Sequence, residues 1–377
     1  DDRTLYVGND KGLYRIDPAV GKSQQIWASE ENGPVNAIVE DPSGQLWLAI
    51  GGQGLLIFDR RNDSTRWIRP DSGMRGSLPQ AAVTELMVDR SGLLWVGTDA
   101  LGLGKVDPQG AAFNYIADRV RAPDQDPGRD QGTFNNIRSI LEDRAGYIWL
   151  GTDGDGLKRF DRKAASFTHF DAAIAEAFGV AHPTALHVES LAEDGGGVIW
   201  FACNLGIGSI DPATGKVSVL EPGPMEKGDD IERSRRAVLI TPDGAIWYAG
   251  RNVGVVRYDP VTGEWRNWRH RDGDRNSLSH DHVLSLYADS SGRIWAGSAD
   301  GLNLIDPASE EVRTFLHEAD NPHSLSGGVV RSIHESADGG IWVGTHGGLN
   351  HLARLDEGPA RFERVLKSDG LPDATIY

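Results

Sequence analysis

A pattern of about ten residues centred on a tryptophan recurs along the whole chain and restricts the fold more than any other feature. Copies such as DPSGQLWLAI, DRSGLLWVGT and DSSGRIWAGS all place a glycine three residues before the tryptophan. An eighth, shortened copy begins the chain, with Tyr6 at the tryptophan position. A period of about 40–50 residues that contains several short strands is typical of a propeller blade. Seven copies, spaced by 47 to 54 residues, have the tryptophan itself: Trp47, Trp95, Trp149, Trp200, Trp247, Trp295 and Trp342.

Each repeat is predicted to form four strands, as the copy around Trp295 illustrates. Turn residues separate short apolar or alternating runs, and Pro307 follows the third run. The predicted strands are 283–288, 293–298, 302–306 and 311–316. The fold class that follows is all-β, a β-propeller of four-stranded blades with eight repeat units. The repeat tryptophans are expected to form the blade cores, because each buries a large apolar area.

The connections between repeats depart from the pattern at three places. Each joins the last strand of one repeat to the first strand of the next, so the three are expected to share one face. Residues 171–179 are predicted to form a short helix, with Asp171 as N-cap and Gly179 as the stop. Variable loops on one face of a regular scaffold are where binding usually occurs. The three connections are 118–133, 171–182 and 221–234.

The consensus V-x-x-I-x-x-D-x-x-G-x-I-W-x-G-T-x-x-G-L-x-x-x-D resembles the two-component regulator propeller repeat, and the resemblance covers the whole chain. Residues 140–161 and 286–306 match it almost throughout, and the lead-in segments GSLPQAAV, NSLSHDHV and HSLSGGVV are also similar to the family. The resemblance implies the periplasmic sensor region of a hybrid histidine kinase or diguanylate cyclase. A β-sandwich, a membrane helix and the output domain would normally follow. The family usually closes rings of seven blades, so a seven-bladed ring plus one extra unit is the alternative to eight.

The two chain ends favour one eight-bladed domain over residues 1–377, cut from a longer sensor protein. Tyr377 falls eleven residues before the position of a further tryptophan, whereas Asp1 falls five before Tyr6. If the ring closes, the C-terminus begins a first strand that belongs with the N-terminal strands. Neither a signal peptide nor a transmembrane run is visible in the sequence. Any membrane attachment is therefore expected through segments outside this chain.

Composition excludes several classes of partner and site. The formal net charge is −17, from 38 Lys and Arg against 55 Asp and Glu, which argues against nucleic acid as a partner. The single cysteine, Cys203, excludes an intrachain disulfide and any multi-cysteine metal site. Two further segments resemble partial metal motifs, His280-Asp-His282 and Asp153-Gly-Asp155-Gly. Both lack the remaining ligands, so loop and turn roles are favoured, and neither a metal nor a cofactor is expected.

Arginine recurs at one position of the predicted first strands, eleven residues before the tryptophan. We hypothesise that Arg138, Arg236 and Arg331, with Arg235, form a basic pocket at one mouth of the channel. The arginine fork suits a carboxylate or sulfate because it bonds two oxygens at once. The remaining copies have Asn36, Thr84, Glu189, Leu284 and, as the eighth, Tyr377. The alternative is that these arginines pair with acids on neighbouring blades, for example Glu40, Glu142, Glu193 or Glu335.

Four tryptophans lie outside the consensus, in predicted outer strands. Their rings could stack on sugars, but packing at the blade edge is the favoured interpretation. They are Trp27, Trp67, Trp265 and Trp268.

Three functions remain open from the sequence. The first is an extracytoplasmic ligand-sensing module of a bacterial receptor that binds a small molecule or oligosaccharide, with no enzymatic activity of its own. Ligand-binding candidates are Arg138, Arg236, Arg331, Arg235, Glu189, His187 and Tyr377. The second is a propeller polysaccharide lyase or hydrolase that would use Arg138, Arg236, His187 and Tyr377. The third is a structural spacer or a platform for a homodimer.

Overall fold

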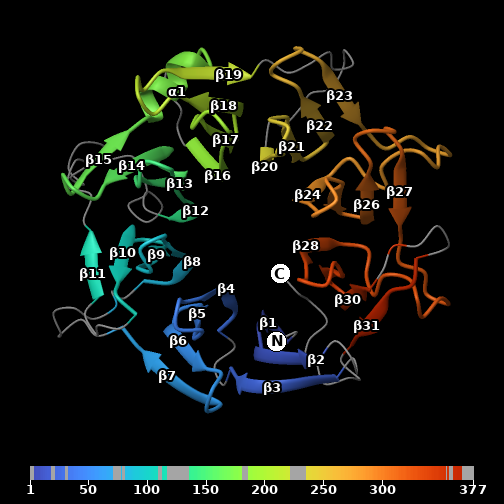
Figure 1. Ribbon diagram of the computed structural model, residues 1–377, viewed down its shortest axis with the longest axis horizontal. Coiled ribbons are helices and arrows are strands. Elements are labelled where there is room, and N and C mark those ends of the chain that lie inside the picture. Colours follow the sequence, from blue (N-terminus) through green and yellow to red (C-terminus); the bar gives the residue numbers. More distant parts are fainter. Residues whose placement is uncertain are drawn as a thin grey trace. The chain divides into compact units, whose positions relative to one another are not determined.

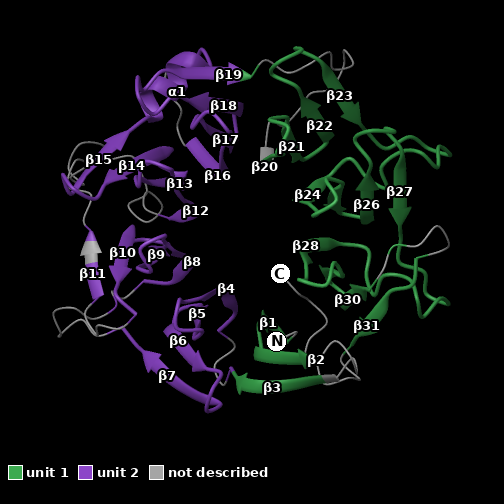
Figure 2. Cartoon of the chain, viewed as in Figure 1, with its two compact units in different colours: residues 1–28, 220–377 green, residues 29–219 purple. Residues whose placement is uncertain are grey.

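The structure is a computed structural model that describes residues 4–17, 22–29, 33–70, 78, 81–108, 113–116, 136–180, 186–220, 235–353, 355 and 360–366. In these residues the chain forms short strands and one short helix (Figure 1). It divides into two compact units (Figure 2): residues 1–28 with 220–377 are unit 1, and residues 29–219 are unit 2. Each unit is built from successive antiparallel sheets, one to a repeat except where two repeats of unit 2 share a sheet.

Unit 2 contains four repeats. The first two sheets are β4 (Val35–Glu40), β5 (Leu46–Ile50), β6 (Gly54–Asp59) and β7 (Ser64–Ile68), then β8 (Val83–Val88), β9 (Leu94–Thr98), β10 (Leu103–Val106) and β11 (Phe113–Ile116). The next two repeats form β12 (Ile137–Glu142), β13 (Ile148–Gly154), β14 (Leu157–Asp161) and β15 (Ser166–His169), then, after α1 (Asp171–Ala177), β16 (Leu186–Glu193), β17 (Ile199–Cys203), β18 (Gly206–Ile210) and β19 (Val217–Leu220). These last two repeats are joined into one eight-stranded sheet, because β13 also pairs with β16.

Unit 1 contains the other four repeats. Three of them form β20 (Arg235–Ile240), β21 (Ile246–Gly250), β22 (Gly254–Tyr258) and β23 (Trp265–Trp268), then β24 (Val283–Ala288), β25 (Ile294–Ser298), β26 (Gly301–Ile305) and β27 (Val312–Phe315), then β28 (Val330–Glu335), β29 (Ile341–Thr345), β30 (Gly348–Leu352) and β31 (Glu363–Val365). The N-terminal repeat forms the three-stranded sheet β1 (Leu5–Asn9), β2 (Gly12–Asp17) and β3 (Lys22–Ala28). Val7 and Tyr14 of that sheet pack on Trp342 and Leu349 of the last repeat.

Most of the predicted elements are confirmed. The four strands expected around Trp295 appear as β24 to β27, each within about one residue of its predicted bounds. The helix after β15 is confirmed, and Gly179 ends it with a φ of +67°. Its predicted cap was wrong: the N-cap is Phe170, and Asp171 is the first helical residue. Residues 118–133, 221–234 and 367–377 lie outside the described residues, so ring closure by Tyr377 and the number of blades stay predictions.

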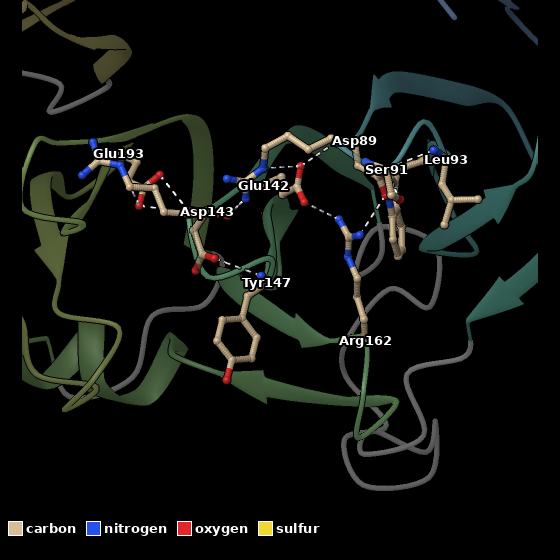
Figure 3. A network of polar contacts seen from close by, with 11 residues as sticks. Asp89, Ser91, Leu93, Glu142, Asp143, Tyr147, Arg162 and Glu193 are labelled. Atoms are coloured by element: carbon tan, nitrogen blue, oxygen red, sulfur yellow. Dashed lines mark hydrogen bonds and ion pairs between the residues drawn. The ribbon is translucent and has the colours of Figure 1, made fainter. Parts of the chain in front are cut away.

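The indole N–H of most repeat tryptophans forms a hydrogen bond that the sequence pattern of the turns did not predict. Six of the seven are buried and Trp200 is partly exposed. In five repeats the indole N–H donates to an aspartate six residues earlier, at 2.6 Å from Trp95 to Asp89 and 2.9 Å from Trp295 to Asp289. The other oxygen of Asp89 accepts the N–H groups of Ser91 and Leu93, which closes the turn (Figure 3). One carboxylate therefore satisfies both the turn and the buried indole.

A second carboxylate links successive sheets within a unit. The carboxylate of Glu142 accepts the backbone N–H of Arg90 in the preceding repeat at 2.9 Å, and Arg162 bonds its other oxygen at 2.8 Å (Figure 3). Glu193 receives the backbone N–H of Arg144 in the same way. In unit 1, Glu335 receives the N–H and the hydroxyl of Ser290. These contacts hold neighbouring first strands side by side.

Candidate functional site

Every described first strand has a β-bulge at the same place. In all seven, the pairing with the second strand shifts by one residue eleven positions before the tryptophan. We call this the bulge position. A bulge leaves one residue out of the ladder and re-aims its side chain. The residues at the bulge position are Asn36, Thr84, Arg138, Glu189, Arg236, Leu284 and Arg331.

Two of these side chains contact the first strand of the next repeat. The amide of Asn36 donates to the Val83 carbonyl at 2.7 Å, and the Thr84 hydroxyl donates to the Ile137 carbonyl at 2.8 Å. The bulge therefore directs its side chain along the row of first strands rather than into the core of its own sheet. This row of positions lies at the ends of the first strands where the connections from the preceding repeats enter.

Two predicted site residues of unit 2, Arg138 and His187, lie close together around an aspartate. The Asp153 carboxylate bonds the Arg138 guanidinium through one oxygen and Nδ1 of His187 through the other. Strand pairing creates this cluster, because Asp153 of β13 lies opposite His187 of β16. The side chains of Arg138 and His187 are 45% and 38% exposed. Burial acts to raise the pKa of Asp153, but bonds and charges from Arg138 and His187 outweigh it and lower that pKa.

The charge of Arg138 is therefore balanced locally. Burial acts to lower the pKa of Arg138, but the bond to Asp153 and the charges of Asp153 and Glu189 raise it overall. The glutamates considered as partners of the arginine positions bond elsewhere. Glu40 bonds Arg60, and the partners of Glu142, Glu193 and Glu335 are those described above.

Arg331, in unit 1, has a different neighbour. Its Nε–H donates to Nε2 of His346 at 3.1 Å, and both side chains are exposed. Within the described ranges, no carboxylate forms an ion pair with Arg331. Partial burial and the charge of Arg331 lower the pKa of His346, so this imidazole is neutral at pH 7 and accepts the bond.

The remaining ligand-binding candidates cannot be placed beside Arg138 or Arg331. Arg235 and Arg236 begin β20 in unit 1, with Arg236 at the bulge, but their side chains lie outside the described residues, as does Tyr377. Arg138 belongs to unit 2, whereas Arg236 and Arg331 belong to unit 1. A pocket shared by the three arginines stays a prediction.

The aspartate and histidine that contact Arg138 and Arg331 occupy equivalent places, four residues after the tryptophan. We call this the turn position. Sequence reasoning missed it as a site, although alignment of the repeats would have shown how much it varies. Its residues are Gly51, Asp99, Asp153, Asn204, Arg251, Ala299 and His346.

The two motifs resembling metal sites have local roles. Nδ1 of His280 accepts the backbone N–H of His282 at 2.8 Å. Asp155 forms a buried ion pair with Lys158 at 2.5 Å. Over the described residues, no group of three His, Cys, Asp or Glu side chains is arranged to hold a metal ion.

One further side chain breaks the repeat pattern. Glu85 follows the bulge of β8, where the other six repeats have Ala or Ser, and it lies opposite Gly97 of β9. Burial raises the pKa of Glu85 to about 7. Burial without a compensating hydrogen bond or ion pair makes ionisation of a carboxyl group unfavourable, so an ionised carboxylate there destabilises the folded state.

Comparison with known proteins relates three of the repeats to a family. Residues 131–154, 277–300 and 324–347 match the family described as two component regulator propeller. Extracellular domains ascribed to two systems of B. thetaiotaomicron are similar in structure. The hybrid two-component system BT3049 matches with a TM-score of 0.56 at 18% identity, over 99% of this chain and 51% of that one. The one-component system BT4673 matches with a TM-score of 0.52 at 20% identity, over 96% and 50%. The chain thus spans about half the length of these two structures.

A streptogramin B lyase shares the fold as well, with a TM-score of 0.54 at 17% identity over 82% of this chain and 89% of the lyase. No curated protein matches the sequence. No helix among the described residues is long and apolar enough to cross a membrane. The predicted fold class, an all-β propeller of four-stranded blades, is confirmed by the sheets and by these likenesses. Three of the repeats, those of Trp149, Trp295 and Trp342, match the two component regulator propeller family.

Proposed function

We propose that this chain is the extracytoplasmic sensing module of a bacterial signal-transduction receptor and that its ligand binds along the bulge positions of the first strands. One observation carries the proposal. The scaffold is the same in seven repeats, with the same tryptophan and the same bulge, yet the bulge residue changes from Asn to Thr, Arg, Glu and Leu. Packing alone favours one residue type at an equivalent site, whereas a binding surface needs different ones.

The family and the structural likenesses support the signalling context. The similar domains of B. thetaiotaomicron are described as extracellular, and this chain spans about half of each. The periplasmic location and the output kinase or cyclase are proposed from the family resemblance. Because three of the seven bulge residues are arginines, the ligand class we favour is an acidic small molecule or oligosaccharide. The alternative to ligand sensing is a structural platform through which the protein forms a homodimer.

A second function, a propeller lyase, is favoured by one arrangement. Asp153 bonds Nδ1 of His187, which is the way a carboxylate orients an imidazole that acts as a base through Nε2. Arg138 on the same carboxylate would hold the acid group of a substrate. The fold likeness to a streptogramin B lyase is compatible with a lyase. Turnover of an acidic glycan, seen as the ultraviolet absorbance of an unsaturated uronide, would establish it.

A thermal-shift screen tests the sensing proposal. The panel pairs acidic saccharides, such as galacturonate oligomers and sulfated oligosaccharides, with neutral oligosaccharides of equal length. A ligand at about 100 times its Kd stabilises the folded state by about 2.7 kcal/mol, which raises Tm by several degrees. We expect a shift from at least one acidic member without turnover. A panel that leaves Tm unchanged throughout contradicts ligand sensing of this class and favours the structural platform.

A further inference from the structure

We infer that Arg331 and His346 form a carboxylate-binding site in unit 1 and that the same two positions around Arg138 do not. This inference rests on the proposed function, because it names one site and one ligand class on the proposed binding surface.

The argument begins with a comparison of equivalent positions. Arg138 and Arg331 both occupy the bulge position, and each contacts the residue at the turn position of its own repeat. In one repeat that residue is Asp153, in the other it is His346. The guanidinium of Arg138 is therefore neutralised before any ligand arrives, and a carboxylate ligand would have to compete with Asp153. Among the described residues, the guanidinium of Arg331 bonds a neutral imidazole and no carboxylate.

Among the described residues, the strands packed on β28 place no carboxylate beside Arg331. β24, β25 and β29 contain no Asp, Glu, Lys, Arg or His, and Tyr287 is their one titratable residue in the described part of the chain. Tyr287 contacts His334, which lies on β28 itself. Glu335, also on β28, is bonded to Ser290, and the nearby turn of β25 and β26 carries Asp300. Two basic side chains thus meet at an exposed place in a chain of net charge −17.

The geometry of the pair specifies the chemistry of the ligand. Nε of Arg331 is used by His346, which leaves the two terminal nitrogens of the guanidinium for a second partner. Those nitrogens present parallel donors that match the two oxygens of one carboxylate. The class of ligand is therefore a compact carboxylate, whether a free organic acid or the uronate of an acidic glycan.

Ligand binding at this place should be coupled to proton uptake by Nε2 of His346, which then donates to the carboxylate instead of accepting from Arg331. The positive charge of Arg331 is one cause of the lowered pKa of His346, partial burial being the larger. A bound carboxylate offsets that charge, so the pKa of His346 is higher in the complex than in the free protein. Between these two pKa values the complex holds more protons, and the affinity rises as pH falls. Above the higher value the affinity no longer depends on His346.

Titration calorimetry with sodium galacturonate, trigalacturonate and lactate tests the site. The proteins are the wild type, Arg331→Gln, Arg331→Lys, Arg138→Gln at the equivalent position and, as the control, Arg266→Gln on the outer strand β23. We expect Arg331→Gln to weaken carboxylate binding by about 10-fold or more, since a charge-assisted pair contributes about 1.5–3 kcal/mol. Arg331→Lys keeps the charge but loses the fork, so an intermediate loss is expected. Arg266→Gln should stay within about twofold of the wild type, and Arg138→Gln should lose less affinity than Arg331→Gln.

His346→Asn tests the proton linkage. The wild type should bind more tightly at pH 5.5 than at pH 8, and this difference should shrink in His346→Asn. Comparison of lactate with the galacturonates separates a free organic acid from a glycan source. An unchanged Tm and circular dichroism spectrum verify that each variant is folded.

The outcomes separate this inference from the proposed function. Equal weakening by Arg331→Gln and Arg138→Gln, or a larger loss from Arg138→Gln, overturns the site. If sulfated or neutral saccharides bind and carboxylates do not, the site is overturned while the sensing function stands. If no member of either panel binds, both are overturned.

Discussion

Replacing Asp89 with alanine is expected to lower the free energy of unfolding by about 3–5 kcal/mol, in the range for breaking a buried charged pair. The Asp89 side chain is fully buried and accepts the Trp95 indole N–H at 2.6 Å. It also accepts the turn N–H groups of Ser91 and Leu93, and it pairs with Arg162 at 3.0 Å (Figure 3). Its removal leaves a buried indole donor and a partly buried guanidinium with fewer acceptors. Urea denaturation followed by circular dichroism measures the loss.

Asp41 provides the matched control. It makes the same bonds, to Trp47 and to the turn residues Ser43 and Gln45, but no described arginine pairs with it. Asp41→Ala should therefore cost less, about 1–3 kcal/mol, the penalty of unpaired buried donors. The excess loss in Asp89→Ala measures the ion pair with Arg162. Equal losses would show that this ion pair contributes nothing, and losses under about 1 kcal/mol in both would contradict the role of the aspartate.

The pH dependence of Asp89→Ala has a definite sign. Burial acts to raise the pKa of Asp89, but its hydrogen bonds and the Arg162 charge outweigh this and hold that pKa below 3.8. A carboxyl with a lowered folded-state pKa stabilises fully above its unfolded pKa and loses this contribution as pH falls through the folded value. The difference in free energy of unfolding between wild type and Asp89→Ala should be constant near neutral pH and should decrease only in acid.

Replacing Glu85 with serine, the residue found at this position in four other repeats, is expected to stabilise the protein at pH 8 by about 2–3 kcal/mol. Burial raises the pKa of Glu85 from 4.5 to about 7, and each pKa unit corresponds to about 1.4 kcal/mol. The expected gain in stability is set below the full energy of this pKa shift, because the Glu85 carboxyl is partly exposed to solvent.

The pH dependence of stability expected from Glu85 is opposite in sign to that expected from Asp89. Below about pH 4.5 the carboxyl is protonated in both the folded and the unfolded chain, so the titration contributes no difference. Between pH 4.5 and 7 the folded chain holds more protons, so wild-type stability falls as pH rises. Denaturant midpoints at pH 4.5 and 8 measure this for wild type, Glu85→Ser and the isosteric Glu85→Gln. A difference that is the same at both pH values would contradict an ionisation effect.

Repetition made most of the fold predictable. Turn residues between short runs located β24 to β27, because glycine and aspartate at fixed offsets leave few alternatives for the chain. The same pattern did not predict the second role of Asp289. Its carboxylate closes the turn and also accepts the indole N–H of Trp295. The helix cap shifted to Phe170, whose ring stacks on Trp149 at 5.2 Å, a tertiary contact that capping rules do not include.

The site was predictable in part. The bulge position was recognised from the arginines at equivalent places, and Arg138, His187 and Glu189 do lie near one another. Their link, Asp153, was not recognised because the relation depends on an extra pairing of β13 with β16. Likewise His346 lies fifteen residues from Arg331 and meets it only across the β28–β29 hairpin. A position examined alone gives no sign of which residue lies opposite it.

Hydrogen exchange measured by mass spectrometry, with and without the acidic saccharide that raises Tm most, tests the central claim most directly. The account predicts slower exchange in peptides that cover the bulge and turn positions, above all 329–335 and 343–349. Exchange in the outer strands β7, β23 and β27 should not change. Protection confined to those outer strands, with none at the bulge or turn positions, would contradict ligand binding along the first strands.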